Sequence, residues 1–155
     1  MRESATTMKT VDLVVLTIWN RHLEILLIRR GKAPHAGQLA LPGGRVARND
    51  LTLHHAATRE LWEETGINVA PSTLDIIGRY DTPGRDPRGD SESTAFLSVL
   101  AGPIPVRAGD DAATAEWVPI HDALTENLAF DHTQILNDGL ALSERLGHTT
   151  ALRRQ

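Results

Sequence analysis

The feature that most restricts the fold of this chain is a short acidic segment, Arg59-Glu60-Leu61-Trp62-Glu63-Glu64-Thr65-Gly66. Apolar residues before and within it recur at helical spacing, which predicts a helix over residues 52–65. These apolar residues are Leu53, Ala56, Ala57 and Leu61. Gly66 is a natural C-terminal stop, and Asp50 or Thr52 is suited to cap the start of the helix.

The three glutamates of this helix share one face. Glu60, Glu63 and Glu64 stand at i, i+3 and i+4, where Cβ atoms are about 5–6 Å apart and like charges repel. They also lie in the last turn, where acidic side chains oppose the helix macrodipole. One interpretation is a solvated acidic face, and the other is a site for a cation. The upstream turn Pro42-Gly43-Gly44 could bring a backbone carbonyl to the same place, and hard oxygen ligands of this kind suit Mg²⁺ or Mn²⁺.

The rest of the sequence predicts an α/β fold. Runs rich in β-branched and aliphatic residues predict strands at residues 11–18, 23–28, 74–80, 94–101 and 116–120. A second amphipathic helix is predicted over residues 131–146. Because strands alternate with helices, we expect helices packed on the faces of a mixed sheet. Residues 1–9 are polar and predicted to be a flexible N-terminus, and residues 10–150 are predicted to form one domain.

Composition excludes several classes of site and partner. The 155 residues include no cysteine, which rules out disulfides, zinc–thiolate sites and thiol nucleophiles. The net charge of -4 argues against a surface that coats nucleic acid. The N-terminus has no apolar core of a signal peptide, and no apolar run is long enough for a membrane span, so we expect a cytoplasmic protein.

Residues 41–67, LPGGRVARNDLTLHHAATRELWEETGI, resemble the Nudix box. That box is a glycine, five residues, Glu, seven residues, and then Arg-Glu-apolar-x-Glu-Glu-x-Gly-apolar. The downstream half matches fully, from Arg59 to Ile67. In the upstream half Asp50 stands where the box has Glu, and eight residues instead of seven separate Asp50 from Arg59. In the family this first acid mainly supports the box arginine, so we expect an adjusted loop and retained chemistry.

The resemblance implies a Nudix α/β/α sandwich, with a mixed β-sheet and the Nudix loop-helix-loop, that hydrolyses diphosphates with Mg²⁺ or Mn²⁺. The implied metal ligands are Glu60, Glu63, Glu64 and the Gly44 carbonyl. The implied catalytic residues are Glu60, Glu64 and Arg59, with Arg59 orienting the carboxylates. One carboxylate, here or in a later loop, would deprotonate a metal-bound water. Asp110 and Asp111 are candidates for that later acid, although a capped turn also explains them.

Stretches outside the box are similar to a narrower group, the ADP-ribose pyrophosphatases and the Nudix module of repressors of NAD metabolism. They are residues 80–89, 108–112, 128–132 and 135–140. The candidate substrate-binding residues are Arg29, Arg30, Arg85, Arg88 and Phe130. An arginine can bind phosphate oxygens, but surface solvation or a salt bridge to Asp81, Asp86 or Asp90 is the alternative. Phe130 is suited to stack on a base or to pack into the core.

Three functions remain open from the sequence. The first is hydrolysis of ADP-ribose or a similar nucleoside diphosphate derivative. The second is hydrolysis of a nucleoside triphosphate with release of pyrophosphate, and the third is an ADP-ribose sensor without turnover. By resemblance we expect a homodimer with a small-molecule substrate. The acidic balance and the short apolar runs predict no nucleic-acid or membrane partner. The histidines, including His121 and His132, are expected to be satisfied or exposed, because none has a second metal ligand at suitable spacing.

Overall fold

A mixed sheet forms the centre of the structure, a computed structural model in which residues 6–148 are described. Within these residues the seven strands follow the order β3-β2-β1-β6-β5, with β4 also paired to β1 and β7 to β2. The strands are β1 (Met8–Trp19), β2 (His22–Arg30), β3 (Leu39–Ala40), β4 (Gly43–Arg45), β5 (Asp75–Tyr80), β6 (Ser91–Leu100) and β7 (Ala112–Pro119). The central β1–β6 pair is parallel and the other pairs are antiparallel, which makes the sheet mixed.

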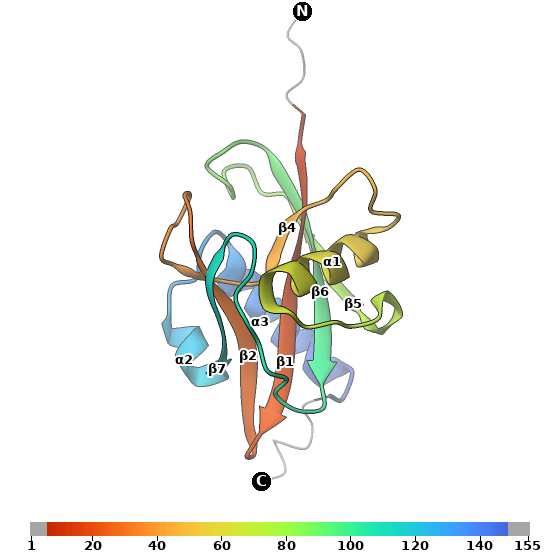
Figure 1. Ribbon diagram of the computed structural model, residues 1–155, viewed down its shortest axis with the longest axis vertical. Helices are drawn as coiled ribbons and strands as arrows, with labels where there is room; N and C mark the ends of the chain where they lie inside the picture. Colours follow the sequence, from red (N-terminus) through yellow and green to blue (C-terminus); the bar gives the residue numbers. More distant parts are fainter. Residues whose placement is uncertain (1–5, 149–155) are drawn as a thin grey trace, which may run out of the picture.

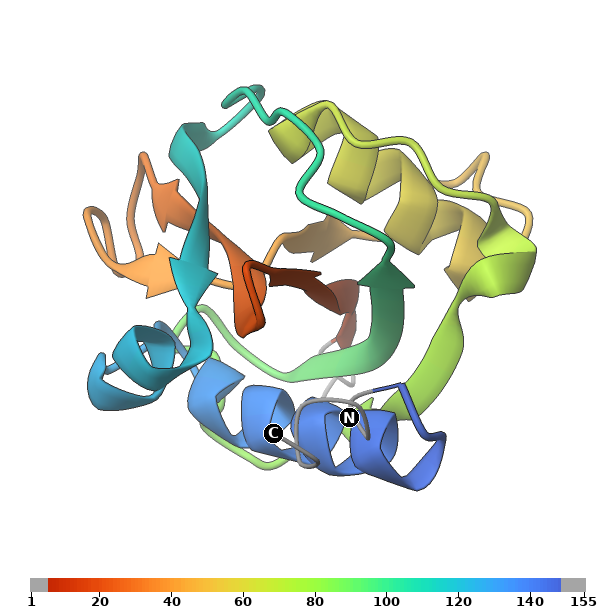
Figure 2. The same ribbon diagram turned by 90° about the horizontal axis from the view of Figure 1, so that it is seen from below.

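Helices cover both faces of this sheet. Helix α1 (Leu53–Thr65) lies on one face and α3 (His132–Arg145) on the other, as the two views show (Figure 1 and Figure 2). The short helix α2 (Ile120–Thr125) follows β7, and a 3₁₀ turn, η1 (Pro71–Thr73), precedes β5. The predicted α/β/α sandwich is confirmed. No helix within residues 6–148 combines the length and the hydropathy that a bilayer span requires.

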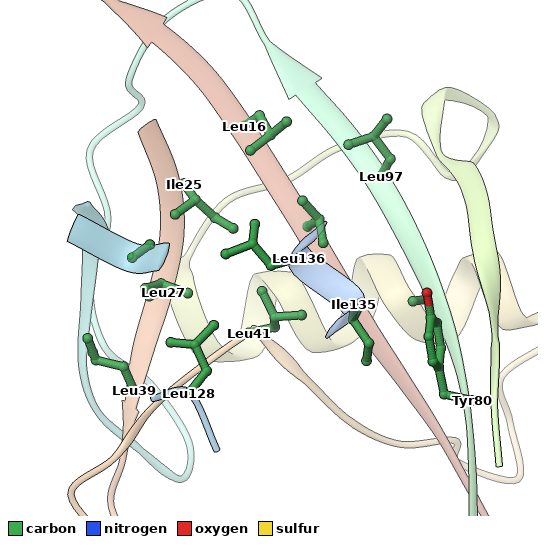
Figure 3. Packing of buried hydrophobic residues seen from close by; sticks show 13 residues of the cluster. Leu16, Ile25, Leu27, Leu39, Leu41, Tyr80, Leu97, Leu128, Ile135 and Leu136 are labelled. Atoms are coloured by element: carbon green, nitrogen blue, oxygen red, sulfur yellow. The ribbon is translucent and has the colours of Figure 1, made fainter. Parts of the chain in front are cut away.

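The central strand β1 is buried on both faces, which explains why its sequence is a nearly continuous apolar run. Leu13 and Val15 pack toward α1, in a cluster with Leu61. Val14 and Leu16 point to the opposite face, as successive strand residues must, and join a cluster that includes Ile135 and Leu136 of α3 (Figure 3). Asp12 is the one charged residue in this buried run, and it lies on the α3 side.

Helix α1 begins and ends as its sequence predicts. The Thr52 side chain accepts a hydrogen bond from the His55 amide at 3.0 Å, so Thr52 and not Asp50 supplies the N-cap. Gly66 ends the helix in the left-handed conformation, with φ of 76°, and its amide donates to the Trp62 carbonyl. These two ends fix the length of the helix that presents the acidic face.

Several element boundaries differ from the sequence prediction. The last strand ends at Pro119, and Ile120 begins α2 instead of extending the strand. Met8 and Lys9 belong to β1, where they pair with Ser91 and Glu92, so the flexible N-terminus predicted over residues 1–9 is wrong at its end. Residues 1–5 of that segment, and residues 149–150 of the predicted domain, lie outside the described residues.

Candidate active site

Arg59, in the middle of α1, is the centre of a polar network that includes the loop before the helix. Its guanidinium donates two bonds to the Asp50 carboxylate, at 2.9 and 2.8 Å, and another to the Arg45 carbonyl. The Ala47 amide donates to the same Asp50 carboxylate at 2.7 Å. The bond from Arg59 contributes most to holding the pKa of Asp50 at about 2. The pairing expected between the first acid and the box arginine is therefore present, with Asp in place of Glu.

The same guanidinium orients two glutamates of the acidic face. It donates to Glu60 at 2.9 Å and to Glu63 at 3.1 Å. Asp110, from the loop before β7, completes a group in which one carboxylate oxygen from each of these three residues lies within 4.8 Å of the others. Burial raises the pKa of Glu60, and the charges of Glu63 and Asp110 add to that effect. A divalent cation would relieve this repulsion, and three carboxylates are a donor set that Mg²⁺ and Mn²⁺ accept.

Glu64 occupies a different position from Glu60 and Glu63. Its Oε1 accepts a hydrogen bond from the Gly43 amide at 2.7 Å, and only 7% of the residue is exposed. Burial raises the pKa of Glu64 to about 8. The three glutamates predicted on one face therefore have two kinds of partner. Glu60 and Glu63 lie beside Asp110, whereas Glu64 accepts a hydrogen bond from the Gly43 amide of β4.

Strand β4 approaches α1 so closely that Gly44 admits no side chain. A Cβ atom on Gly44 would lie 2.5 Å from the carboxyl carbon of Glu60. The register of β4 on β1, with Gly44 opposite Val11, fixes this approach. The backbone of Gly44 therefore adjoins the acidic group, which is the position expected for a further oxygen ligand.

Two adjoining hollows open beside these residues and share part of their lining. The shared residues are Thr10, Ile28, Arg30, Gly43, Gly44, Glu64 and Arg88. The first, here named the acidic hollow, is completed by Lys32, Arg45, Glu60, Asp110 and Asp111. The second, here named the Phe130 hollow, is completed by Asp12, Leu41, Arg85, Asp86, Phe130 and His132. A ligand that occupies both hollows passes Glu64 at their junction.

Arg30 and Arg88 are the two arginines at this junction. Their guanidinium carbons lie 4.9 and 5.9 Å from the centre of the Phe130 ring. Burial, with a further effect from Arg88, lowers the pKa of Arg30. Arg88 also donates to Asp86, one of the salt-bridge partners weighed from the sequence. Both arginines line both hollows, and two guanidinium groups in one site favour an anionic ligand.

Phe130 has features of both predicted roles. It packs partly against the small core cluster of Ile28, Ala40 and Ala129. It also lines the Phe130 hollow, and its backbone is in the left-handed region, with φ of 55°. Non-glycine residues rarely adopt this conformation, and here it places a half-buried aromatic ring at the wall of a cavity.

Arg29 and Arg85 are less well placed for a ligand than Arg30 and Arg88, which line both hollows. Arg29 lines neither hollow, and its side chain donates to the Gly37 carbonyl at 2.7 Å. Arg85 lines the Phe130 hollow but forms a buried two-bond ion pair with Asp131, at 2.9 and 2.7 Å. The salt-bridge alternative therefore applies to Arg85, with a partner that the sequence did not indicate.

The two acids of the loop before β7, Asp110 and Asp111, have different contacts. Asp110 joins the acidic group with Glu60 and Glu63. Asp111 pairs with Lys32 at 2.8 Å, and both of these side chains are largely exposed. Asp110 is therefore the stronger candidate for the later acid.

Asp12 and His132 are site residues that sequence reasoning did not select. His132 is satisfied, as expected of the histidines, but it is buried in the wall of the Phe130 hollow. Its Nε2 lies 3.2 Å from an Asp12 oxygen, and its Nδ1 accepts the Leu41 amide proton. A lone acid within an apolar strand was the available signal, because a buried charge needs a partner.

Comparisons with known proteins agree with this geometry. The family model described as NUDIX domain matches residues 8–138. The ADP-ribose pyrophosphatase of Methanocaldococcus jannaschii is 42% identical over 116 residues, which cover 74% of this chain and 64% of the relative. The ADPR responsive transcriptional repressor NtrR of Acinetobacter baylyi is 33% identical over 144 residues, which cover 92% of this chain and 57% of the relative. This chain therefore spans less than two thirds of the length of either relative.

A solved structure has the same fold over most of both chains. It is the NUDIX domain of Shewanella oneidensis NrtR complexed with ADP ribose, which superposes with a TM-score of 0.83 at 27% identity. The match covers 92% of this chain and 90% of that chain.

Proposed function

The chain belongs to the Nudix family, and from this premise we propose that it is a divalent-cation-dependent hydrolase of the diphosphate bond in ADP-ribose or a similar nucleoside diphosphate derivative. The observation that carries the proposal is the group of Glu60, Glu63 and Asp110, which adjoins Glu64 and two arginines in one pair of hollows. The similarity to an ADP-ribose pyrophosphatase, and to a Nudix domain complexed with ADP ribose, supports the choice of substrate.

The acidic group is the proposed site of Mg²⁺ or Mn²⁺. Glu60, Glu63 and Asp110 would hold the cation, with the Gly44 carbonyl as an adjoining ligand and Glu64 beside them. A divalent cation there lowers the pKa of a bound water and neutralises charge on phosphate oxygens. Arg59, which is held by Asp50, donates to the Glu60 and Glu63 carboxylates and keeps them in place.

Glu64 is the proposed general base. Its Oε1 is occupied by the Gly43 amide, which leaves Oε2 to accept a proton from the attacking water. The raised pKa of this carboxyl fits proton transfer near neutral pH. Arg30 and Arg88 are proposed to bind the phosphates, and Phe130 to stack on the base or ribose that follows them.

The test is an activity screen of the purified protein with Mg²⁺ or Mn²⁺ over ADP-ribose, nucleotide sugars, dinucleotides and nucleoside triphosphates. We expect AMP and ribose 5-phosphate from ADP-ribose. Glu64→Gln should abolish this release, whereas Glu126→Gln, at an exposed site at the end of α2, should not change it. Release of pyrophosphate from nucleoside triphosphates, with none of AMP from ADP-ribose, would contradict the proposed substrate.

A sensor is the second candidate function, favoured by the 33% identity to a repressor that responds to ADPR. A sensor would bind ADP-ribose tightly without hydrolysing it at any concentration of divalent cation. Calorimetric titration with ADP-ribose, followed by analysis of the recovered nucleotide, distinguishes the two functions. The homodimer and the cytoplasmic location remain predictions from the sequence.

A further inference from the structure

A network of polar contacts connects the start of α3 to Leu41, two residues before the strand β4 that carries Gly43 and Gly44. Arg85 binds Asp131, the residue before His132, and its guanidinium lies 3.7 Å from Asp12. Asp12 in turn accepts a bond from Ser93 on β6 at 2.5 Å and faces the His132 ring. The last contact in the network joins His132 to the backbone of Leu41.

The contacts of the His132 ring fix where its proton lies. Nδ1 receives the Leu41 amide at 3.0 Å. A backbone N–H can only donate, so Nδ1 carries no proton. The ring proton is then on Nε2, which faces the Asp12 carboxylate at 3.2 Å. His132 is therefore a neutral ring held in one tautomer, with 3% of the residue exposed.

Beside the pairing of β4 with β1, three polar contacts hold the segment from Leu41 to Gly43. The Leu41 amide binds His132, the Pro42 carbonyl accepts the Leu13 amide at 2.9 Å, and the Gly43 amide binds Glu64. The second contact joins two backbones, and the third is part of the active site itself. Arg59 also donates to the Arg45 carbonyl, at the far end of β4. The bond to His132 is the side-chain contact that holds the segment leading into β4 from the side of α3.

We propose that His132, held by Asp12, is a positioning residue that fixes Gly43 and Gly44 against Glu60 and Glu64. The inference rests on the proposed function in taking that acidic group as the catalytic site. The approach is close enough that a small movement of the strand matters, because Gly44 has no room for even one carbon atom beside the Glu60 carboxylate. His132 needs no contact with substrate for this role.

Two substitutions separate the contacts of the two ring nitrogens. In His132→Asn the side-chain oxygen takes the place of Nδ1 and can accept the Leu41 amide, while the partner of Asp12 is lost. In His132→Gln the side-chain amide takes the place of Nε2 and can donate to Asp12, while the acceptor for Leu41 is lost. We expect His132→Gln to lower kcat about 10–100-fold, as loss of a supporting contact at a metal site does. His132→Asn should lose less of kcat than His132→Gln, because it keeps an acceptor for the Leu41 amide.

Two measurements test the positioning role without relying on turnover. Titration of the substrate-free proteins with Mn²⁺, followed by electron paramagnetic resonance, should show weaker binding in His132→Gln than in His132→Asn. Histidine ¹H–¹⁵N correlation spectra of the wild-type protein should show a proton on Nε2 and none on Nδ1 of His132. If wild type hydrolyses no substrate while Mn²⁺ affinity still separates the two variants, the proposed function fails and the positioning role stands.

Other outcomes would overturn the inference. A proton on Nδ1 of His132 removes its basis, whatever the variants do. Equal losses of kcat and of Mn²⁺ affinity in the two variants, in proportion to their losses of Tm, would mean that His132 is merely structural.

Discussion

Asp50 shows how a shorter carboxylate serves in the Nudix loop. It receives both arms of the Arg59 guanidinium and the Ala47 amide, and Arg59 then orients Glu60 and Glu63. Asp50 therefore pairs with the box arginine, as the box Glu is expected to do. It acts on the Glu60 and Glu63 carboxylates through Arg59.

We predict that Asp50→Asn lowers kcat about 10-fold or more, because it removes the charge that holds the Arg59 guanidinium. It should also destabilise the fold by about 1–3 kcal/mol, since the charge-assisted hydrogen bonds of a partly buried carboxylate are weakened. Steady-state kinetics and urea unfolding measure the two effects. Asp75→Asn, at an exposed position of β5, is the control, and equal activity of the two variants would contradict the role given to Asp50.

Glu64 makes the stability of the metal-free protein depend on pH. Burial raises its pKa from 4.5 to about 8, so between these values the folded protein keeps a proton that the unfolded chain has released. The stability associated with Glu64 is therefore complete below pH 4.5 and is lost as the pH rises through 8. We predict that Glu64→Gln, measured in EDTA, is more stable than wild type above pH 8, by an amount on the order of a few kcal/mol.

The comparison to make is the difference in Tm between wild type and Glu64→Gln from pH 5 to pH 9. The difference should grow with pH in EDTA and shrink when Mn²⁺ is added, because a cation stabilises the carboxylate. A difference that stays constant over this range would show that Glu64 is already ionised in the metal-free protein.

Among the contacts between helices and strands, the close approach of β4 to α1 matters most for the site. Gly44→Ala would place a methyl group 2.5 Å from the Glu60 carboxyl carbon, so the carboxylate or the strand must move. We predict a loss of activity of about 10–100-fold or more with a destabilisation of about 1–3 kcal/mol. Gly102→Ala is the matched control, because a Cβ atom there has no neighbour within 4 Å. Kinetics and thermal melts of the two variants decide the outcome, and full activity of Gly44→Ala would refute the close approach.

Elements with a complete local signal could be predicted from the sequence, and those without one could not. Helix α1 has apolar spacing, a capping threonine and a terminal glycine, and β1 has a long apolar run. Strands β3 and β4 have two and three residues, too few to show a period, and exist because β2 and β1 offer them partners.

Some side chains of the site could likewise be predicted from the sequence, and others could not. The spacing within α1 was enough to place Glu60, Glu63 and Glu64 on one side of the helix. Which of two adjacent arginines on β2 faces the cavity depends on the phase of the strand, which the sequence did not fix. Asp12 and His132 are 120 positions apart in the sequence and meet only because β1 and α3 pack together.

At the scale of the whole molecule, the site joins both helical layers through the sheet. The acidic hollow takes Glu60 and Glu64 from α1, whereas the Phe130 hollow takes His132 from α3. A ligand that occupies both hollows therefore binds only the complete fold, and its binding energy adds to the free energy of unfolding.

We predict that ADP-ribose with Mn²⁺ stabilises the Glu64→Gln protein by about 2.7 kcal/mol at a ligand concentration 100 times Kd. For a chain of this size each kcal/mol raises Tm by about 2–4 °C. Arg88→Ala in the same background should lose most of this shift at equal ligand concentration, since Arg88 lines both hollows. Arg79→Ala, at an exposed position of β5, should keep it. A shift that survives Arg88→Ala would place the diphosphate elsewhere, and no shift in the Glu64→Gln protein would exclude ADP-ribose as its ligand.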